Sequence, residues 1–388
     1  MLTFLAFLAL GAWLYLAFGH GDFWRAEARL DAPPPREPET WPEAVAVIPA
    51  RDEAAVIART LASHQASDYP GRFSLVVVDD ESADETGALA RAAAAEGPRA
   101  VDVIDAPPLA PGWTGKLSAL AAGVARAKEL APDARYFLFT DADIEHAPAT
   151  LRRLVAKAET ENLALVSLMA RLDARGAWGP LLIPAFVYFF QKLYPFARVN
   201  NPESTVAAAA GGCMLVRREA YDAAGGAEAI RDQLIDDCAL ARRIKREGAG
   251  APRRIWLGLA SDEVVSLRDN RALSSVWRMV ARTAFAQLDH SWLLLAGTVA
   301  GMAIVYLVPP LAALSALWAG ATPAVGYGLA AWAVMAATYR PTATLYGLSF
   351  WKTLLLPLAA FFYMLMTISS AERYARGEGG SWKGRSYS

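Results

Sequence analysis

The apolar residues of this chain fall into long uncharged stretches near both ends and short apolar runs in the middle. Residues 1–19 carry no Asp, Glu, Lys or Arg. Near the other end, the 49 residues of 291–339 and the 19 residues of 353–371 are also uncharged. A helix that crosses a bilayer needs roughly 20 apolar residues. We therefore expect a transmembrane anchor over 1–20 and two or three transmembrane segments within 291–371.

A cleaved signal peptide is the alternative interpretation of the first uncharged stretch. Such a peptide needs a basic start and a cleavage site of small residues, and this stretch has neither. We therefore interpret residues 1–20 as an uncleaved anchor. Arg25, Arg29 and Arg36 follow it in the Pro-rich linker 21–43, so the positive-inside rule favours a central region that faces the cytoplasm.

Between the two ends, apolar runs alternate with Ala-rich segments of helical character. The runs cover 44–50, 74–80, 100–105 and 136–143, and the segments between them cover 53–65, 83–96 and 117–131. Val-rich runs without strict alternation are typical of strands covered on both faces. This order predicts an α/β fold with right-handed crossovers and a mostly parallel sheet, in which ligands bind beyond the carboxyl ends of the strands. A capping box from Ser82 to Glu85 is expected to open the second helix.

Two further segments have apolar faces but are too short to span a bilayer. Residues 178–196 are apolar, aromatic and interrupted by Pro, which favours either a helix in the membrane interface or a core helix. Residues 272–290 combine a basic and an apolar face and predict an amphipathic interface helix. The globular domain is then expected over 44–271, and a basic tail over 372–388.

Composition agrees with membrane attachment and argues against several classes of function. The 388-residue chain is 55% apolar, and its mean hydropathy is +0.23, which is high for a soluble enzyme of this length. Its net charge of −1 gives no reason to expect nucleic acid as a partner. Cys213 and Cys238 lack metal-ligand spacing and are expected to be buried thiols in a reducing compartment. Pro49 to Glu53 follows the first strand where a dinucleotide-binding enzyme would carry Gly-x-Gly-x-x-Gly.

Acidic residues follow the predicted strands at the edge where ligands bind. Asp141 and Asp143 flank a single residue, so in extended geometry their side chains point the same way and can share one Mg²⁺ or Mn²⁺. A solvated turn, or a cap for a helix over 147–160, is the alternative. Asp79 and Asp80 end another strand, and a nucleotide with a metal-bound diphosphate would supply the groups needed between such like charges. A helix cap is again the simpler alternative.

Two further charged positions lie at the predicted starts of helices. Lys116, in a Gly-rich loop, could neutralise phosphate oxygens at a helix N-terminus, although surface lysines in loops are common. Asp236 and Asp237 open a helix with an apolar stripe at Leu234 and Cys238. A carboxylate there could act as a general base, but ordinary acids at a helix start look the same in sequence.

Six segments, in this order and at these separations, resemble the inverting family 2 glycosyltransferases. They are VIPARDE (47–53), VVVDDESADET (76–86), GKLSALAAGV (115–124), FTDADI (139–144), GGCMLVRREAYDAAGG (211–226) and IDDCALARRIKREG (235–248). The resemblance covers about 44–290. With its hydrophobic ends, the chain is most similar to the bacterial hopanoid-biosynthesis-associated glycosyltransferases and more distantly to ceramide glucosyltransferase. The resemblance implies a GT-A fold, a nucleotide-sugar donor, a divalent cation (Mg²⁺ or Mn²⁺) and a place in the bacterial inner membrane.

Position in these motifs also implies residue roles. The resemblance assigns nucleotide-sugar binding to Pro49, Glu53, Asp80, Lys116, Asp141 and Arg282, metal binding to Asp143 with Asp141, and the catalytic base to Asp237. Ala121 departs from the family, whose members carry Asn there. Thr283 follows Arg282, whereas processive synthases and ceramide glucosyltransferases carry Arg-Trp in this region. The aromatic platform for a growing sugar chain is therefore missing, and we expect transfer of a single sugar.

The implied reaction is one in-line displacement, in which Asp237 takes the proton of an acceptor hydroxyl as the bond to UDP breaks. The hydrophobic ends favour a lipid acceptor, such as a hopanoid or a related lipid. Two alternatives stay open. A polyprenyl-phosphate sugar synthase would share the aspartate motifs but use a phosphate acceptor, and a catalytically silent membrane scaffold would keep only the fold.

Overall fold

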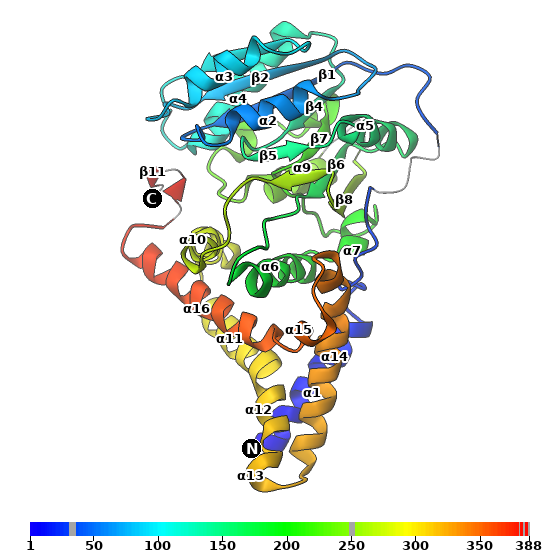
Figure 1. The fold of residues 1–388 in the computed structure, drawn as a ribbon, viewed down its shortest axis with the longest axis vertical. Helices are drawn as coiled ribbons and strands as arrows, with labels where there is room; N and C mark the ends of the chain where they lie inside the picture. The colour runs from blue at the N-terminus through cyan, green and yellow to red at the C-terminus, as the bar shows by residue number, and fades with distance from the viewer. Residues whose placement is uncertain (31–35, 248–252, 380, 383–384, 387–388) are drawn as a thin grey trace.

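The computed structural model describes residues 1–30, 36–247, 253–379, 381–382 and 385–386. Residues 31–35 of the predicted linker and Lys383 of the predicted basic tail lie outside the described residues. In Figure 1 an α/β layer occupies one end of the molecule and a tapering group of helices occupies the other, with the N-terminus near its tip.

A seven-stranded sheet forms the centre of the α/β layer. Its strands are β1 (Ala44–Ala50), β2 (Phe73–Asp79), β3 (Val101–Asp105), β4 (Tyr136–Phe139), β6 (Leu165–Met169), β7 (Met214–Arg217) and β8 (Ile255–Leu259), in the spatial order β3-β2-β1-β4-β7-β6-β8. All pairings are parallel except those of β7, which runs antiparallel to both β4 and β6. The predicted mostly parallel sheet is therefore confirmed. Beside it, β5 (Ile144–His146) and β9 (Val264–Ser266) form a small antiparallel pair.

Helices cover both faces of this sheet, which explains why its strands are continuously apolar. On one face, α4 (Gly115–Leu130) and α9 (Asp236–Glu247) pack in a cluster that contains Val45 and Val47 of β1. On the other, α2 (Ile57–Gln65), α3 (Thr86–Ala94) and α5 (Thr150–Thr160) pack in a cluster that contains Ala46 and Ile48. Successive side chains of a strand point to opposite faces, so every position of β1 is buried.

The predicted capping box is wrong. Helix α3 begins at Thr86, and Glu85, which precedes it, makes no side-chain cap hydrogen bond. The Ser82 hydroxyl instead donates to the Asp79 carboxylate, and Asp84 accepts from the Thr86 amide at 3.0 Å. The Ser82 side chain therefore bonds to Asp79 within the loop after β2 and does not cap α3.

Most of the other helices form the tapering end or connect it to the sheet layer. They are α1 (Leu2–Phe18), α6 (Gly179–Leu193), α10 (Leu273–Thr283), α11 (Trp292–Met302), η3 (Ala303–Leu307), α12 (Val308–Leu314), α13 (Ala316–Ala319), α14 (Pro323–Leu345), α15 (Phe350–Thr353) and α16 (Leu356–Ala375). Helices α1, α12 and α14 run side by side towards the tip (Figure 1). Among the described residues, two helical runs, Trp292–Ala319 and Phe350–Ala375, are long and apolar enough to cross a membrane, and α1 and α6 are shorter apolar helices.

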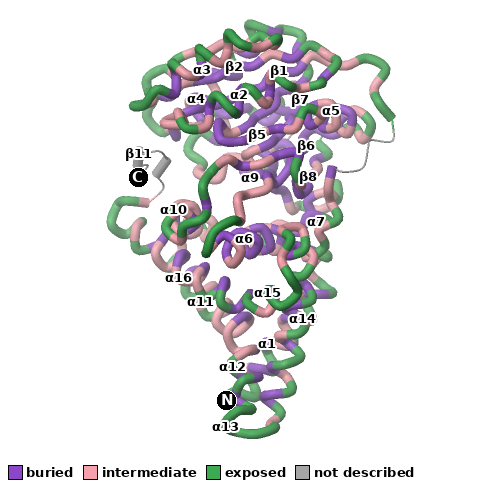
Figure 2. The backbone as a smooth tube through the Cα atoms, in the orientation of Figure 1, coloured by how far each residue is buried: buried purple, intermediate pink, exposed green. Residues whose placement is uncertain are grey.

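Exposed apolar side chains concentrate in this tapering end, where exposed and intermediate positions alternate with buried ones along the helices (Figure 2). Of the large apolar side chains that are exposed among the described residues, only Leu130 lies outside residues 1–18, α6 and the region from Trp292 to Tyr374. Phe18, Leu293 and Leu317 are 80%, 82% and 81% exposed. Apolar patches of this kind are rare on monomeric soluble proteins and mark surfaces that contact lipid or another protein.

Helix α6 lies between the sheet and the tapering helices. Tyr188 and Gln191 are buried, and their side chains bond to Thr338 and Thr342 of α14 at 2.8 and 2.9 Å. One side of α6 is therefore packed against α14, and the choice between the two interpretations of 178–196 stays a prediction. The predicted amphipathic helix appears as α10, which packs along α16 and bonds to it from Trp277 to Ser369 at 3.1 Å.

The close approach of α4 to the sheet is testable at Gly123. A Cβ added there would lie 2.4 Å from Val47 Cγ1 and 2.9 Å from Val78 Cγ2. Gly123→Val should therefore lower the free energy of unfolding by about 1–3 kcal/mol, seen as a lower thermal midpoint in detergent. Ala125→Val, on the exposed side of the same helix, adds a β-branched residue without this clash. Equal thermal midpoints for the two variants would contradict the close packing of α4 against the sheet at Gly123.

Candidate active site

A cleft at the carboxyl ends of the parallel strands collects most of the predicted site residues. It consists of two adjoining hollows that share Pro49, Lys116, Asp141 and Asp236. The first hollow is also lined by Arg51, Glu53, Thr114, Asp143, Gln233, Arg268 and Arg282, and the second by Thr140, Gly211 and Asp237. We call this site the Lys116 cleft. Of the predicted site residues, only Asp80 is not among those that line it.

Lys116 lies at the centre of the cleft, in the first turn of α4. The hydroxyl of Thr114 caps this helix by accepting from the Leu117 amide at 3.4 Å. The ammonium nitrogen Nζ of Lys116 lies 3.1 Å from Asp141 Oδ1 and 3.1 Å from Asp236 Oδ2. Burial acts to lower the pKa of Lys116, but the neighbouring carboxylates outweigh it and raise this pKa overall. The ammonium is therefore charged at any working pH.

Asp237 lies in the first turn of α9 with its carboxylate held by the backbone. One oxygen accepts from the Gly211 amide at 2.8 Å, and the other accepts from the Cys238 amide at 2.7 Å. Burial, with the adjacent charge of Asp236, raises the pKa of Asp237 to about 6. A carboxylate whose pKa lies close to neutral pH is suited to accept a proton.

Asp141 and Asp143 follow β4, but the extended geometry expected for them is wrong. The strand ends at Phe139 and the chain turns, so each carboxylate has its own cationic partner. Asp141 contacts Lys116, and Asp143 Oδ2 lies 3.0 Å from Nε of Arg268. No group of three or more His, Cys, Asp and Glu side chains suited to a metal ion is found in the described part of the chain. The metal site therefore stays a prediction.

Asp80 belongs to the layer behind the cleft. Its side chain is 3% exposed, and Oδ2 lies 3.7 Å from a guanidinium nitrogen of Arg51, which lines the cleft. The loops after β1 and β2 both bend through the left-handed region, at Asp52 (φ 50°) and Glu81 (φ 52°). Residues other than Gly adopt this conformation infrequently, and often at functional sites.

Three arginines complete the site, and two of them were not predicted. Arg51 stands inside the motif after β1 but has no distinguishing sequence signal of its own. Arg268 comes from the segment after β9, where no motif marks it, yet it reaches Asp143 and lies 3.8 Å from Glu53. Arg282 of α10, which was predicted to bind the nucleotide-sugar, lines the same hollow, and burial, with the charge of Arg268, lowers its pKa.

Asp236 was recognised as part of an acidic pair, but its role as a partner of Lys116 was not predicted. The spacing of two consecutive acids does not reveal which of them faces a lysine from another helix. In the structure, Asp236 pairs with the ammonium and Asp237 faces the Gly211 amide. The two carboxylates are thus distinguished by their environments alone.

The raised pKa of Asp237 predicts a stability difference that depends on pH. Its pKa of about 6 in the folded protein exceeds the ordinary value of 3.8, so its contribution to stability is full below pH 3.8 and is lost as the pH rises through 6. Asp237→Asn removes the buried charge. The variant should therefore have a higher thermal midpoint than the parent at a pH of about 8, and this gain should vanish near a pH of about 4.

The exposed residue Asp133 provides the control for this experiment. Asp133→Asn removes the same charge from the surface, at the opposite end of β4 from the cleft. A gain in midpoint at high pH that is equal for both variants would contradict a specific cost of burying the Asp237 carboxylate.

Comparison with known proteins gives the domain a family. Residues 45–225 match the sequence profile described as glycosyl transferase family 2. No curated protein sequence matches the chain. The fold is similar to the mannosyltransferase PcManGT from Pyrobaculum calidifontis in complex with GDP-Man and Mn²⁺, with a TM-score of 0.57 and 23% identity over 94% of this chain and 99% of that chain.

Two other solved structures are less similar in fold. Glucosyl-3-phosphoglycerate synthase from Mycobacterium tuberculosis has a TM-score of 0.40 and 22% identity over 63% of this chain and 80% of its own. Mannosyl-3-phosphoglycerate synthase from Rubrobacter xylanophilus has a TM-score of 0.38 and 20% identity over 63% of this chain and 73% of its own. On the family match, residues 45–225 form a glycosyl transferase family 2 domain of GT-A fold, and the protein is a glycosyltransferase.

Proposed function

We propose that this enzyme transfers one sugar from a nucleotide-sugar to a lipid acceptor at a membrane surface, with inversion at the anomeric carbon. The observation that carries the proposal is the position of α10. This helix contributes Arg282 to the Lys116 cleft, and its Val276 and Val280 are buried among the apolar helices. A lipid held at the surface of those helices would therefore lie close to the donor.

The nucleotide end of the donor would occupy the β1 side of the cleft. Pro49 and Glu53 line this side, and Asp80 would act on the base or ribose from behind Arg51. Lys116 and Arg282 would face the diphosphate. Cationic side chains in a partly buried cleft bind phosphate strongly because water screens them little.

The residues present fit a divalent cation whose remaining ligands would be phosphate oxygens of the donor. Mg²⁺ is usually held by one or two carboxylates together with the phosphates of the substrate, so a site of three protein ligands is not required. Asp143, with Asp141, would hold the cation at the positions where Arg268 and Lys116 now neutralise these carboxylates. The bound Mg²⁺ or Mn²⁺ would stabilise the charge that develops on the departing diphosphate. The similar mannosyltransferase is described with Mn²⁺.

Asp237 would take the proton of the acceptor hydroxyl. The two backbone amides fix its carboxylate, and its pKa of about 6 leaves it ionised at neutral pH. Lys116, held between Asp141 and Asp236, would keep the neighbouring charges balanced while the proton is transferred. One positioned base typically contributes about 10²- to 10⁴-fold to a rate.

The acceptor would be a hopanoid or a related lipid, met where the catalytic domain joins the helices. The exposed apolar surfaces of α1 and of the region from Trp292 to Tyr374 would lie in the bilayer. A bacterial inner membrane, with the catalytic domain on the cytoplasmic side, agrees with Arg25, Arg29 and Arg36 after the first helix.

A polyprenyl-phosphate sugar synthase is the second candidate, because two arginines, Arg268 and Arg282, line the same hollow and could hold an acceptor phosphate as well as the donor. Product analysis separates the two functions. Purified full-length protein would be incubated with labelled UDP- and GDP-sugars and either hopanoid-containing lipid or a polyprenyl phosphate. We expect a single labelled sugar on the hopanoid-type lipid, and a label only on the polyprenyl phosphate would replace this acceptor assignment.

Asp237→Asn should lower kcat by about 10²- to 10⁴-fold with little change in donor affinity, because the carboxylate would act on the acceptor. Transfer rates and equilibrium binding of the nucleotide-sugar measure the two effects separately. Asp133→Asn is the matched control and should keep the parent rate. Equal transfer rates for Asp237→Asn and the parent would contradict the role of this carboxylate as the base.

Removal of divalent cations should abolish transfer, and Mn²⁺ or Mg²⁺ should restore it, because the departing diphosphate needs a counter-charge. Asp143→Asn should raise the cation concentration needed for half-maximal rate by at least about tenfold, roughly the loss of one charged ligand. The titration is followed by the transfer rate at saturating donor. Undiminished transfer in excess chelator would contradict the proposed cation.

A further inference from the structure

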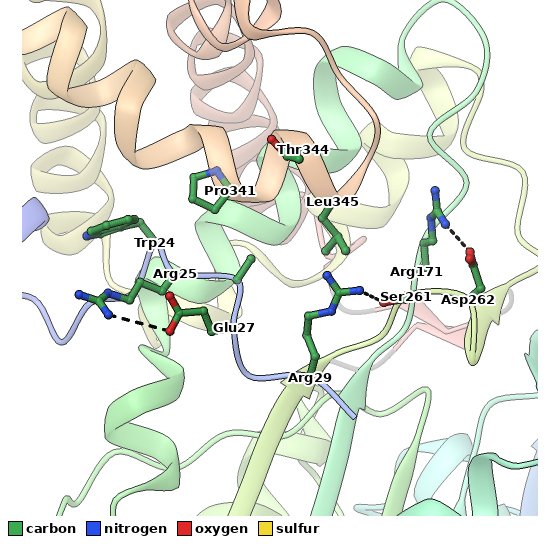
Figure 3. Close-up of a pocket in the computed structure, with 11 residues that line it drawn as sticks. Trp24, Arg25, Glu27, Arg29, Arg171, Ser261, Asp262, Pro341, Thr344 and Leu345 are labelled. Atoms are coloured by element: carbon green, nitrogen blue, oxygen red, sulfur yellow. Dashed lines mark hydrogen bonds and ion pairs between the residues drawn. The ribbon is translucent and has the colours of Figure 1, made fainter. Parts of the chain in front are cut away.

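A second pocket lies between the sheet and α14, separate from the Lys116 cleft. Its lining includes Arg25, Arg29, Arg171, Ser261, Asp262 and Leu345, and its volume is about 470 Å³. Figure 3 shows its side chains, with the Arg29 guanidinium next to Leu345 of α14 and Arg171 beside Asp262. We call it the arginine pocket. It shares no residue with the Lys116 cleft.

We propose that the arginine pocket binds the phosphate of an anionic lipid headgroup, as a site distinct from those of the sugar donor and acceptor. The proposal rests on the proposed function only in placing the apolar helices in a bilayer. It assigns a ligand to a cavity whose volume lies within the range of about 300–1,000 Å³ found for small-molecule sites.

The charge of the pocket favours an anion. Three arginines line it against two acids, Glu27 and Asp262, which leaves a formal charge of 3 − 2 = +1 from the lining residues. Guanidinium groups bind phosphate in a bidentate manner and are weakly hydrated. The hydroxyls of Ser261 and Thr344 add neutral hydrogen-bonding groups to the same wall.

Two of the arginines are held in place by side-chain partners. Arg29 donates to the Ser261 hydroxyl, and Arg171 pairs with Asp262, whose side chain is 85% exposed. Arg25 is more loosely held, since its nitrogens lie 3.6 Å from Asp22 and 3.9 Å from Glu27, beyond ordinary hydrogen-bonding distance. An entering phosphate could therefore replace exposed acids with a stronger bidentate partner.

The pocket also lies where a headgroup would be. Trp24 and Arg25 lie just beyond the loop 19–23 that follows the apolar helix α1, and Pro341 and Leu345 belong to the last turns of α14, which packs against α1. Trp24 donates to the Ala17 carbonyl at 2.9 Å. A Trp at the end of an apolar helix is typical of the headgroup level of a bilayer, and basic pockets beside membrane helices on the cytoplasmic side bind anionic headgroups.

The remaining wall comes from the sheet, so a bound lipid would touch both parts of the molecule. Arg171 follows β6, and Ser261 and Asp262 follow β8. The segment that begins with Ser261 continues through β9 to Arg268, which contacts Asp143 in the Lys116 cleft. A headgroup in the arginine pocket would thus hold the start of a segment whose end lines the cleft.

The test uses purified full-length protein in neutral detergent, without any sugar donor. The probe is a fluorescent short-chain phosphatidylglycerol, displaced by unlabelled phosphatidylglycerol, phosphatidylcholine of equal chain length or inorganic phosphate. We expect phosphatidylglycerol to displace the probe, phosphatidylcholine to do so poorly, and inorganic phosphate to act only at far higher concentration because it lacks acyl chains.

Different variants of the arginine pocket should change probe binding in opposite directions. Arg29→Gln and Arg171→Gln should each weaken probe binding about fivefold, and Asp262→Asn should strengthen it by a similar factor. A misfolded variant could lose binding but not gain it, so the second change protects the test against a folding artefact. Arg91→Gln is the matched control, because it breaks a similar surface pair, with Asp105, at the opposite edge of the sheet.

Three results would overturn the proposal. They are equal displacement by phosphatidylcholine and phosphatidylglycerol, equal displacement by inorganic phosphate, which would make the site one for a soluble anion, and unchanged binding in all three pocket variants. Because no donor is present, these outcomes are independent of glycosyl transfer. A protein without transferase activity would still bind the probe, and an active enzyme that failed to bind it would refute the arginine pocket alone.

Discussion

The arrangement of the active-site region depends on one ammonium group among carboxylates. Asp141 follows β4, Asp236 and Asp237 open α9, and Lys116 opens α4, so the three elements must end or begin at the same edge of the sheet. Without the lysine, the carboxylates would face one another in a partly buried space, where like charges repel strongly. The raised pKa of Lys116 and the lowered pKa of Asp141 express this mutual stabilisation.

The same interaction distinguishes two consecutive aspartates. The Lys116 ammonium pairs with Asp236. The Asp237 carboxylate instead accepts a hydrogen bond from a backbone amide and has a raised pKa. One helix start thereby presents a carboxylate paired with an ammonium group and a second carboxylate able to exchange a proton near neutral pH. This difference between the two aspartates arises only from their contacts in the folded protein, since each residue alone is an ordinary acid at a helix N-terminus.

Sequence predicted the parts of the structure that local pattern determines. The Val-rich runs became β1, β2, β3 and the first part of the β4 prediction because both faces of the sheet are covered, and the acidic residues fell at the ligand-binding edge. Pattern failed where a tertiary contact decides. The end of β4 at Phe139 and the approach of Arg268 to Asp143 depend on partners that are remote in the sequence, whereas the Ser82 bond to Asp79 is a local alternative to the predicted cap. The two interpretations of 178–196 could not be separated, because lipid and a packed helix bundle select the same apolar composition.

The attachment of α10 to α16 limits how the enzyme can be divided. Trp277 and the Phe285 amide both bond to serines of α16, while Arg282, between them, lines the cleft. An excised fragment that stopped after β9 would keep every strand of the sheet but lack this wall of its binding site. A soluble version suitable for crystallisation would therefore have to carry α10 along, with polar replacements on the side that now rests on α16.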